Sequence, residues 1–377
     1  MNWGDTWRST RVRMAMAVLR MLLGRVAAEV PSQYVTDLTE IVHIPDVQNH
    51  VTECTPWTAA FVEEYDFPTS FPLSFRRSHA FERRFIYRMT DVTTAPRSGV
   101  VLIPDKGRVM AESFGSMLRT IGWDDVRPDL LARAFDATWH DPVVLSPPTG
   151  YYHWLLEVLP RVLRAHDSEP TVKALVPADC PRYITDALAL LGIGRLETDR
   201  RAVRLRDVLV PGALQASGFI PSVDIDQLRS SVLPTITDLH KEQCAPELIY
   251  VSRAKDARRA LGNELAVEEL AREFGFSVVY LQDLMWTEQV HRMSKAEVLV
   301  SPHGAGLANM IWSTGLSAVI EIFPFGVRND CYARLTLQRG ADYSFIDAEQ
   351  ESGSNGMVNL QRLKNHISSA LEIRDQH

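Results

Sequence analysis

Residues 298–309 read VLVSPHGAGLAN, in which an apolar run ends in a turn with two glycines. The run predicts a buried strand, and a helix is expected from about Leu307. Glycines at a strand-to-helix turn let an anion approach the backbone, and the free N–H groups of the first helical turn face its charge. The stretch therefore predicts a diphosphate site at Gly304, Ala305 and Gly306.

Two neighbours of this turn carry polar side chains. His303 could donate a hydrogen bond to a phosphate or sugar oxygen, and Asn309 lies about one turn into the expected helix. The alternatives are that the glycines only make a tight turn and that His303 is a structural residue. The spacing is not GxGxxG, which argues against an NAD fingerprint.

Strands and helices alternate around the glycine turn. The strands are expected at 248–252, 277–281, 298–301 and 318–323, and the helices at 264–274, 287–294, from 307, and at 332–338. This order indicates a parallel sheet covered by helices, a Rossmann-like layer sandwich.

The first half also has an α/β pattern, with strands expected at 100–104, 171–177 and 208–211 and a helix at 184–191. A long helix over 224–243 follows, with Asp224 as its N-cap. The predicted boundaries are an N-terminal helix in 1–35, a first α/β domain 36–240, a Rossmann-like domain 241–350 that holds the glycine turn, and a C-terminal segment 351–377 whose helix could return to the first domain.

Composition excludes several classes of protein. The chain of 377 residues has a formal net charge of −7, which argues against a general nucleic-acid binder. Its four cysteines form no CxxC pair, so neither a zinc knuckle nor a redox motif is indicated. It has no Asn-X-Ser/Thr acceptor, which favours a bacterial cytoplasmic setting over a secretory lumen.

Residues 14–27 are apolar, but Arg20 and Arg25 interrupt them, so the run is too short for a bilayer span. Two interpretations stay open for residues 8–30. The segment is a helix packed on the protein, or a basic amphipathic helix at the inner face of a membrane.

Glu321 is a single carboxylate in the apolar run AVIEIF, residues 318–323. It lies near the carboxyl end of a predicted parallel strand, where ligands bind in such sheets. A carboxylate there can accept hydrogen bonds from both ribose hydroxyls of a nucleotide, whereas a structural glutamate would need a buried partner. The sequence therefore predicts a ribose contact.

A basic loop, YVSRAKDARR at 250–259, begins where another strand ends. Arg253 and Arg259 are expected to bind diphosphate, because guanidinium groups match phosphate oxygens and their fixed charge can replace a metal. The alternative is a solvated turn with counterions. Asn263 is expected to cap the next helix and to be one of the nucleotide-binding residues of the same site.

The segment YYHWLLEVLPR, residues 151–161, places His153 and Glu157 four residues apart. On a helix they share one face, so Glu157 could orient His153 and raise its basicity. His153 would then accept a proton from an acceptor hydroxyl. The alternative is an aromatic core helix with a satisfied histidine.

Asp224 and Asp226 form the chain's DxD triplet, a pattern that can hold Mn²⁺ or Mg²⁺ at a strand end. Here the triplet opens a predicted helix, so Asp224 is interpreted as a cap and no metal ligand is assigned.

Four of these motifs, taken in order, resemble glycosyltransferase family 61: YYHWLLEVLPR, YVSRAKDARR with Asn263 and Glu264, SPHGAGLANMIW and AVIEIFP. The resemblance covers about residues 140–345. It implies a GT-B-like α/β fold with two Rossmann-like domains facing a cleft, inverting chemistry, and a bacterial role in capsular or other surface polysaccharide synthesis. Eukaryotic relatives transfer xylose, arabinose or N-acetylglucosamine, so the sugar is not fixed.

These observations together predict a metal-independent, inverting glycosyltransferase. Arg253, Arg259 and the glycine turn would hold the diphosphate of a nucleotide sugar, with a UDP-sugar favoured, and His153 or Glu157 would deprotonate a glycan or polysaccharide acceptor. No cofactor is expected. The rival interpretations are a nucleotide-binding scaffold without catalysis and an NAD-dependent oxidoreductase.

Overall fold

The computed structural model describes residues 51–68, 70–72, 74–81, 83–103, 108–110, 138–148, 150–212, 218–240, 245–256, 260–350 and 356–376. The expected N-terminal helix at 8–30 and the basic residue Arg259 lie outside these ranges. Within them, no helix combines the length and apolar character needed to cross a bilayer.

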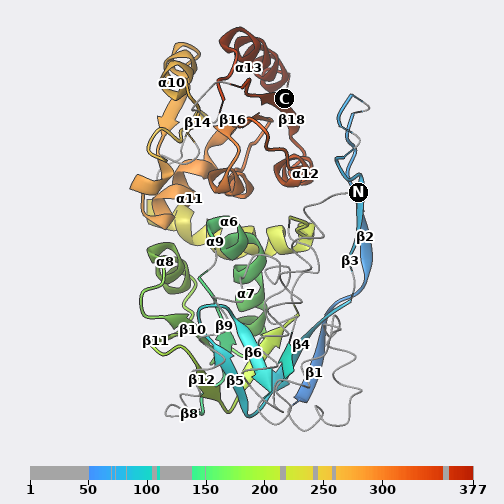
Figure 1. The fold of residues 1–377 in the computed structure, drawn as a ribbon, viewed down its shortest axis with the longest axis vertical. Coiled ribbons are helices and arrows are strands. Elements are labelled where there is room, and N and C mark those ends of the chain that lie inside the picture. Colours follow the sequence, from blue (N-terminus) through green and yellow to red (C-terminus); the bar gives the residue numbers. More distant parts are fainter. Residues whose placement is uncertain are drawn as a thin grey trace.

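The described chain is a mixed α/β structure with its two halves at opposite ends of the molecule (Figure 1). Helices α6 (Tyr151–His153) and α9 (Ser222–His240) lie between the halves. Contacts of α9 with the C-terminal helix α11 (Trp286–Ser294) join them. The junction between the halves therefore has helices on both sides.

The C-terminal half contains a fully parallel sheet of five strands in the order β15–β14–β16–β17–β18. The strands are β14 (Glu247–Val251), β15 (Ser277–Val279), β16 (Ala296–Pro302), β17 (Ala318–Phe323) and β18 (Asp342–Asp347). Its helices are α10 (Glu264–Glu273), α11, α12 (Cys331–Gln338) and α13 (Leu360–Arg374), with a one-turn 3₁₀ segment, η4, at Leu281–Asp283. The expected parallel sheet with helices between its strands is confirmed here.

The strands of this sheet are buried on both faces, as parallel sheets require. Val300 and Ile320 pack on one face against α10 and α13, whereas Leu299 and Val319 belong to the cluster on the other face. The C-terminal helix corrects an expectation, because α13 does not cross to the first half: it packs on β16, β17, β18 and α10. Its apolar face requires this, since Leu363 and Ile367 are buried against the sheet.

In the described residues, the first half contains two larger sheets and a two-stranded hairpin, and its strands are only partly parallel. The six-stranded sheet has the order β1 (Val51–Thr58), β4 (Arg84–Met89), β13 (Val208–Pro211), β9 (Val143–Leu145), β10 (Lys173–Pro177) and β11 (Arg195–Thr198). The five-stranded sheet has the order β7 (Arg108–Met110), β6 (Val100–Ile103), β5 (Val92–Ala95), β12 (Val203–Leu205) and β8 (Thr138–Trp139). Strands β13, β9, β10 and β11 run parallel to one another. Strand β4 runs antiparallel to both of its neighbours, β13 and β1.

Short connections explain this departure from the expected pattern. Only Thr90 and Asp91 separate β4 from β5, and Asp91 has a φ of 55°. Gly99, with a φ of 70°, lies in the four-residue hairpin connection between β5 and β6. The β5–β6 connection can join only an antiparallel pair, because a parallel pair needs a crossover of a dozen or more residues. The two-residue turn after β4 passes the chain from the six-stranded to the five-stranded sheet.

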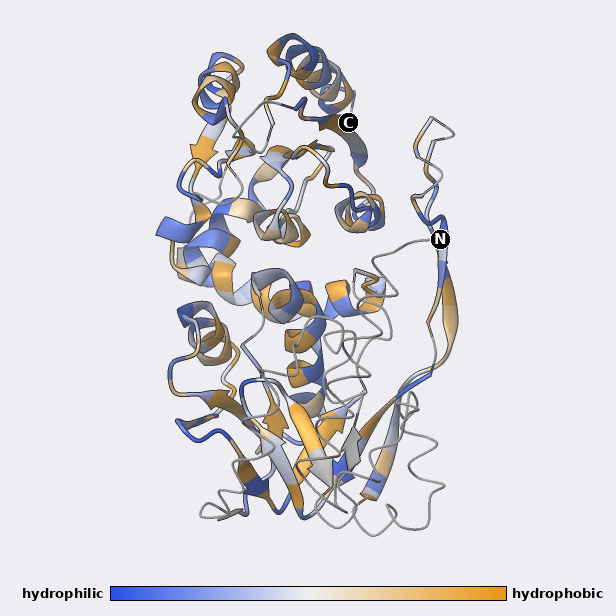
Figure 2. Cartoon of the chain, in the orientation of Figure 1, coloured by the Kyte–Doolittle hydropathy of each residue, from blue (hydrophilic) through white to orange (hydrophobic). Residues whose placement is uncertain are grey.

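Helices α7 (Leu159–Ser168), α8 (Arg182–Leu190) and α9 complete the first half. One core cluster lies between its two sheets, and the larger cluster includes the buried faces of α7, α8 and α9. The helices carry hydrophobic and hydrophilic residues in alternation (Figure 2), as helices with one buried face do.

Asp224 corrects the expected start of α9, because the helix begins at Ser222 and Asp224 lies in its first turn. Its carboxylate is buried and pairs with both terminal nitrogens of Arg84, at 2.7 and 3.0 Å. The Arg84 guanidinium also lies 4.0 Å from the centroid of the Trp57 ring. Asp224 therefore joins α9 to the sheet instead of capping the helix.

A long hairpin connects the halves on one side. It is formed by β2 (Phe61–Glu64) and β3 (Ser78–Phe81), which extend along the molecule (Figure 1). The Glu63 carboxylate accepts hydrogen bonds from the Ser222 backbone N–H at 2.7 Å and from Gln338 Nε2 of α12 at 2.6 Å. Phe71, in the hairpin's loop, packs against the Phe345 ring of β18 with 5.6 Å between centroids.

Candidate active site

The order of strands in the C-terminal sheet reverses between β14 and β16, and the carboxyl ends of these two strands border that point. From β14 the chain passes through α10 to β15 on one side, and from β16 it passes to β17 on the other. Ligands of open α/β sheets bind at such a point. Arg253 follows β14 and His303 follows β16, and Arg253 Nη1 donates to the His303 carbonyl at 2.6 Å. The structure thus brings these two predicted site residues together.

Gly304 is required by the Arg253 side chain. A Cβ atom at Gly304 would lie 1.8 Å from Arg253 Nη1, so any larger residue must displace the guanidinium. A Cβ at Gly306 would lie 3.2 Å from both Leu281 Cδ1 and Val251 Cγ1. The two glycines therefore allow close packing of this turn, and Gly304 keeps Arg253 against its backbone.

The segment after the turn is a 3₁₀-helix, η5 (Ala305–Trp312), where an α-helix was expected. Its winding begins with the Leu307 N–H donating to the Gly304 carbonyl at 3.0 Å. All residues from Leu307 to Trp312 are buried, and a helix that is apolar all round is typical of a core position.

Asn309 does not have the predicted nucleotide-binding role, because its side chain is fully buried. Its Oδ1 accepts a hydrogen bond from Tyr151 Oη at 2.6 Å and one from Trp312 Nε1 at 3.2 Å. Since Tyr151 belongs to α6, Asn309 joins η5 to the first half.

Glu321 corrects the predicted ribose contact. Its carboxyl group is 0% exposed, and both oxygens are occupied. Oε1 lies 2.5 Å from His303 Nδ1, and Oε2 accepts from Tyr343 Oη at 2.5 Å. Burial raises the pKa of this carboxyl group, and the hydrogen bonds from His303 and Tyr343 oppose that rise. The buried partner that a structural glutamate needs is present, so Glu321 acts on His303.

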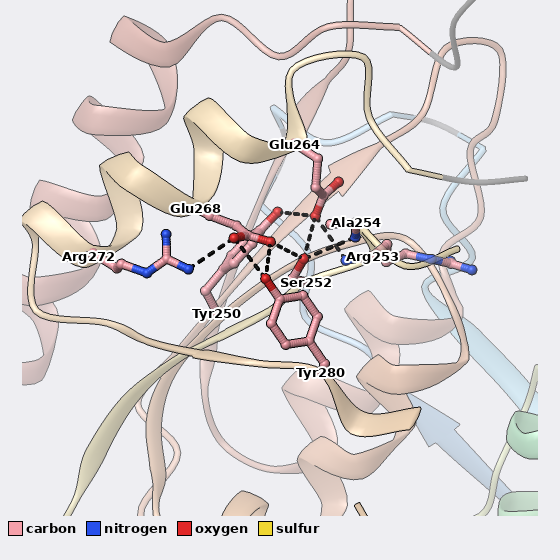
Figure 3. Close-up of polar contacts among 8 residues, drawn as sticks. All are labelled: Tyr250, Ser252, Arg253, Ala254, Glu264, Glu268, Arg272 and Tyr280. Atoms are coloured by element: carbon pink, nitrogen blue, oxygen red, sulfur yellow. Dashed lines mark hydrogen bonds and ion pairs between the residues drawn. The ribbon is translucent and has the colours of Figure 1, made fainter. Parts of the chain in front are cut away.

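Two buried carboxylates hold the start of the basic loop (Figure 3). Glu264 Oε1 accepts hydrogen bonds from the Arg253 backbone N–H at 2.9 Å and from Tyr250 Oη at 2.6 Å. Glu268 Oε1 accepts from Ser252 Oγ at 2.6 Å, and Ser252 Oγ in turn accepts from the Ala254 N–H at 3.0 Å. This network fixes the backbone from which the Arg253 side chain projects.

The charged side chains of the loop have counterions, as the alternative interpretation expected. Arg253 Nη2 pairs with Asp256, and Lys255 pairs with Asp283. Asn263 is corrected on two counts, because its side chain makes no N-cap bond and binds the Val358 backbone instead, with Nδ2 donating at 2.9 Å and Oδ1 accepting at 3.0 Å. Arg259 lies outside the described residues.

The His153–Glu157 pair forms as the sequence predicts. His153 ends α6, a π-helical turn, η3, spans Trp154–Val158, and α7 follows with Pro160 near its start. Proline has no N–H to donate, and π-turns recur at functional sites. His153 Nδ1 lies 3.1 Å from Glu157 Oε2, while Glu157 Oε1 accepts from the Gly218 N–H at 3.3 Å.

Glu157 raises the pKa of His153, since its hydrogen bond to the ring outweighs the opposing effect of burial. His153 is therefore a stronger base than a free histidine. About a third of its side chain remains exposed, at 32%, so a substrate hydroxyl could reach it.

Tyr332, which the sequence reasoning did not single out, links the two groups of residues. Its ring lies 5.3 Å from the His303 ring and 5.5 Å from the Tyr152 ring, edge to face in both cases. The Tyr152 ring lies 5.3 Å from that of His153. The sequence predicted a helix at 332–338 but carried no signal for which of its rings would face the site.

No group of three or more His, Cys, Asp or Glu residues is placed to hold a metal ion in the described part of the chain. In the DxD triplet, the Asp224 carboxylate is already bound by Arg84. That pairing leaves the triplet poorly suited to a metal.

The sequence is similar to known glycosyltransferases. Residues 151–320 match the family model described as Glycosyltransferase 61. This range contains the His153–Glu157 pair, the basic loop and the glycine turn. The matched range ends one residue before Glu321.

Curated relatives carry the name Protein O-linked-mannose beta-1,4-N-acetylglucosaminyltransferase 2. The Bos taurus protein is 30% identical over 121 residues, or 31% of this chain and 21% of the relative. The Xenopus tropicalis protein is 33% identical over 98 residues, or 25% and 17%, and that of Mus musculus is 31% identical over 105 residues, or 26% and 18%. The chain thus matches about a fifth of the length of these relatives, which are animal proteins.

Proposed function

We propose that this protein is an inverting, metal-independent glycosyltransferase that moves a sugar from a nucleotide sugar to a glycan or polysaccharide acceptor. One observation carries the proposal. Arg253 and His303 meet where the strand order of the parallel sheet reverses, and the rings of Tyr332 and Tyr152 lie between His303 and His153 of the first half. The family match over residues 151–320 supports the same reaction class. A GT-B-like arrangement, with the sugar between the halves, is part of the proposal.

The donor diphosphate would bind at the glycine turn, beside Arg253 and His303. The Arg253 side chain is 17% exposed and its backbone is fixed by Glu264, so its charge is held in place before a ligand arrives. Fixed positive charge stabilises the negative charge that develops on a leaving diphosphate without reorganisation. Arg259 is assigned to the same group from the sequence.

The acceptor would be activated by His153. Its imidazole takes the proton of the acceptor hydroxyl while that oxygen bonds to the anomeric carbon, and the bond from this carbon to the diphosphate breaks. The electron pair of the broken bond leaves with the diphosphate. A single displacement of this kind inverts the anomeric centre, and Glu157 stabilises the imidazolium that forms.

The donor and the acceptor are proposed as classes of compound, a nucleotide sugar and a glycan. The relatives are named for N-acetylglucosaminyl transfer to O-linked mannose, which makes UDP-N-acetylglucosamine the first donor to test. A role in bacterial surface polysaccharide synthesis rests on the sequence resemblance, since the three relatives described above are animal proteins. A cytoplasmic location, with contact to the membrane through residues 8–30, stays a prediction.

A thermal-shift comparison of UDP, GDP and CMP sugars, followed by a transfer assay on mannosides and bacterial glycans, tests the proposal. A donor that binds the folded protein raises Tm by mass action. We expect a shift with a UDP-sugar and release of UDP when acceptor is added. No shift with any nucleotide sugar would contradict the donor site, whereas binding without transfer or hydrolysis would favour the scaffold interpretation.

A further inference from the structure

Three neighbouring strands place His303, Glu321 and Tyr343 on one face of the C-terminal sheet. Ser301 pairs with Glu321 across β16 and β17, and Val319 pairs with Tyr343 across β17 and β18. Side chains two residues apart on a strand share a face. His303 is two residues beyond Ser301, and Glu321 is two beyond Val319, so the register brings the three side chains together.

The chain of hydrogen bonds that results is buried except at its His303 end. The exposed fraction is 8% for Tyr343, 0% for Glu321 and 14% for the His303 side chain. Phe71, from the hairpin of the first half, packs against Tyr343 with 5.9 Å between ring centroids, and Phe323 lies 5.5 Å from the His303 ring. In such apolar surroundings a hydrogen bond is electrostatically stronger than in water.

This arrangement determines which nitrogen of His303 a ligand can use. Nδ1 is bound by Glu321 Oε1, which leaves Nε2 for a ligand. When the carboxyl group and the ring hold two protons in total, Nε2 carries one of them whether the other lies on Nδ1 or on Glu321. In this two-proton state the ring presents an N–H donor at Nε2, whereas with a single proton on Nδ1 the Nε2 atom could only accept. The inference therefore requires the two-proton state when a diphosphate is bound.

We infer that Glu321 and Tyr343 are positioning residues, which fix the His303 ring so that Nε2–H donates to an oxygen of the donor's diphosphate. Tyr343 acts through Glu321: its hydroxyl occupies Oε2 and leaves Oε1 directed at Nδ1. The inference rests on the proposed function, because it needs a diphosphate at the glycine turn.

An apolar residue at position 321 would avoid the cost of burying a carboxyl group. Glu321 is the only charged residue among the six residues of β17, whose other members are all apolar. Its two hydrogen bonds offset that cost, and one of them is directed at the residue that borders the site.

Ring ¹⁵N NMR of histidine-labelled protein tests the inference, with the His303 signals assigned by their loss in His303→Asn. The probe is UDP. In the wild type we expect protonated Nε2, with a resonance that moves when UDP is added. In Glu321→Gln and Tyr343→Phe we expect the two ring nitrogens to shift toward averaged positions, because both tautomers become populated.

UDP affinity supplies the second readout. Loss of the Glu321 charge should weaken UDP binding about 10- to 100-fold, and loss of the Tyr343 hydroxyl about 3- to 10-fold. Tyr65→Phe is the matched control, because Tyr65 is also buried and also donates to a glutamate, Glu63, at 3.2 Å. It should leave the His303 resonances and the UDP affinity unchanged.

The outcomes separate the inference from the proposed function. If the wild type binds UDP but both variants keep wild-type ring resonances and affinity, the positioning role is overturned. The same holds if Tyr65→Phe weakens UDP binding as much as Tyr343→Phe does. If the wild type binds no UDP, the proposed donor site fails and the diphosphate part with it, while the resonances of the free protein still decide whether Glu321 and Tyr343 fix the ring.

Discussion

The described residues include two histidine–glutamate pairs with similar contacts and different surroundings. His153 and Glu157 lie one turn apart on a helix at the junction, and the His153 side chain is 32% exposed. His303 and Glu321 come from adjacent strands, where the His303 side chain is 14% exposed and Glu321 is fully buried. The first pair is open enough to exchange a proton with a substrate, whereas the second is built to hold a ring in one orientation.

The largest expected effect on activity comes from removing His153, the proposed base of the more exposed pair. His153→Ala should lower kcat/KM by about 10²- to 10⁴-fold, the usual contribution of a general base. UDP affinity should stay close to that of the wild type, because the donor contacts lie in the other half. Steady-state kinetics and calorimetry with UDP measure both quantities.

His166→Ala, in the helix that follows the π-turn, is the matched control for that substitution. Its kcat/KM should remain within about threefold of wild type, the effect expected of a group that takes no part in proton transfer. Equal losses in the two variants would show that the effect is structural, and that His153 is not the base.

The next effect concerns the C-terminal half. Gly304→Ala places a Cβ where Arg253 Nη1 now lies, so the guanidinium must move. We expect UDP binding to weaken about 10- to 100-fold, the range for loss of hydrogen bonds to a charged group. Gly315→Ala is the control, because a Cβ at that glycine meets nothing within 4 Å.

A double-mutant cycle sharpens this prediction. If Gly304→Ala acts through Arg253, it should add little further loss in an Arg253→Ala protein. Full additivity of the two substitutions would show that the glycine serves some purpose other than making room for Arg253.

A smaller effect, of about tenfold at the plateau, is expected for Glu157→Gln. Glu157 raises the pKa of His153, and a base works only above its pKa. The kcat/KM of the wild type should therefore rise with pH above the usual histidine range, and in Glu157→Gln this rise should move to lower pH. A pH profile unchanged by the substitution would remove His153 from the mechanism.

Removal of metal ions should have the smallest effect. Turnover in EDTA should remain within about twofold of the untreated rate, since fixed positive charge can stabilise the leaving diphosphate. Strict dependence on Mn²⁺, restored when the ion is added back, would reject the metal-independent chemistry.

The C-terminal half follows the sequence pattern closely, and β17 spans the expected residues, 318–323. Parallel strands buried on both faces appear as apolar runs separated by helical periods, so local pattern and topology agree. In the first half, the strands at 100–103 and 208–211 were found, but the reversals at Asp91 and Gly99 that make its sheets mixed were not. A short turn gives little signal about which sheet the next strand joins.

Site residues show the same limit. His153 and Glu157 could be paired from sequence because helical spacing brings i and i+4 together. The partners of Glu321 and Asn309 could not, because Tyr343 and Tyr151 reach them only through sheet register and the contact between halves. Sequence therefore located the polar residues near the site but could not tell a ligand contact from a buried tertiary bond.

The Glu63 carboxylate restricts how the two halves can move. It accepts hydrogen bonds from the start of α9 and from the end of α12, so one side chain holds an element of each half. Any rotation that keeps both bonds must have its axis close to this carboxylate, since points far from an axis move most. A rotation about that axis would also have to break the Tyr151–Asn309 hydrogen bond, which joins η5 to the first half, so these side chains together oppose separation of the halves.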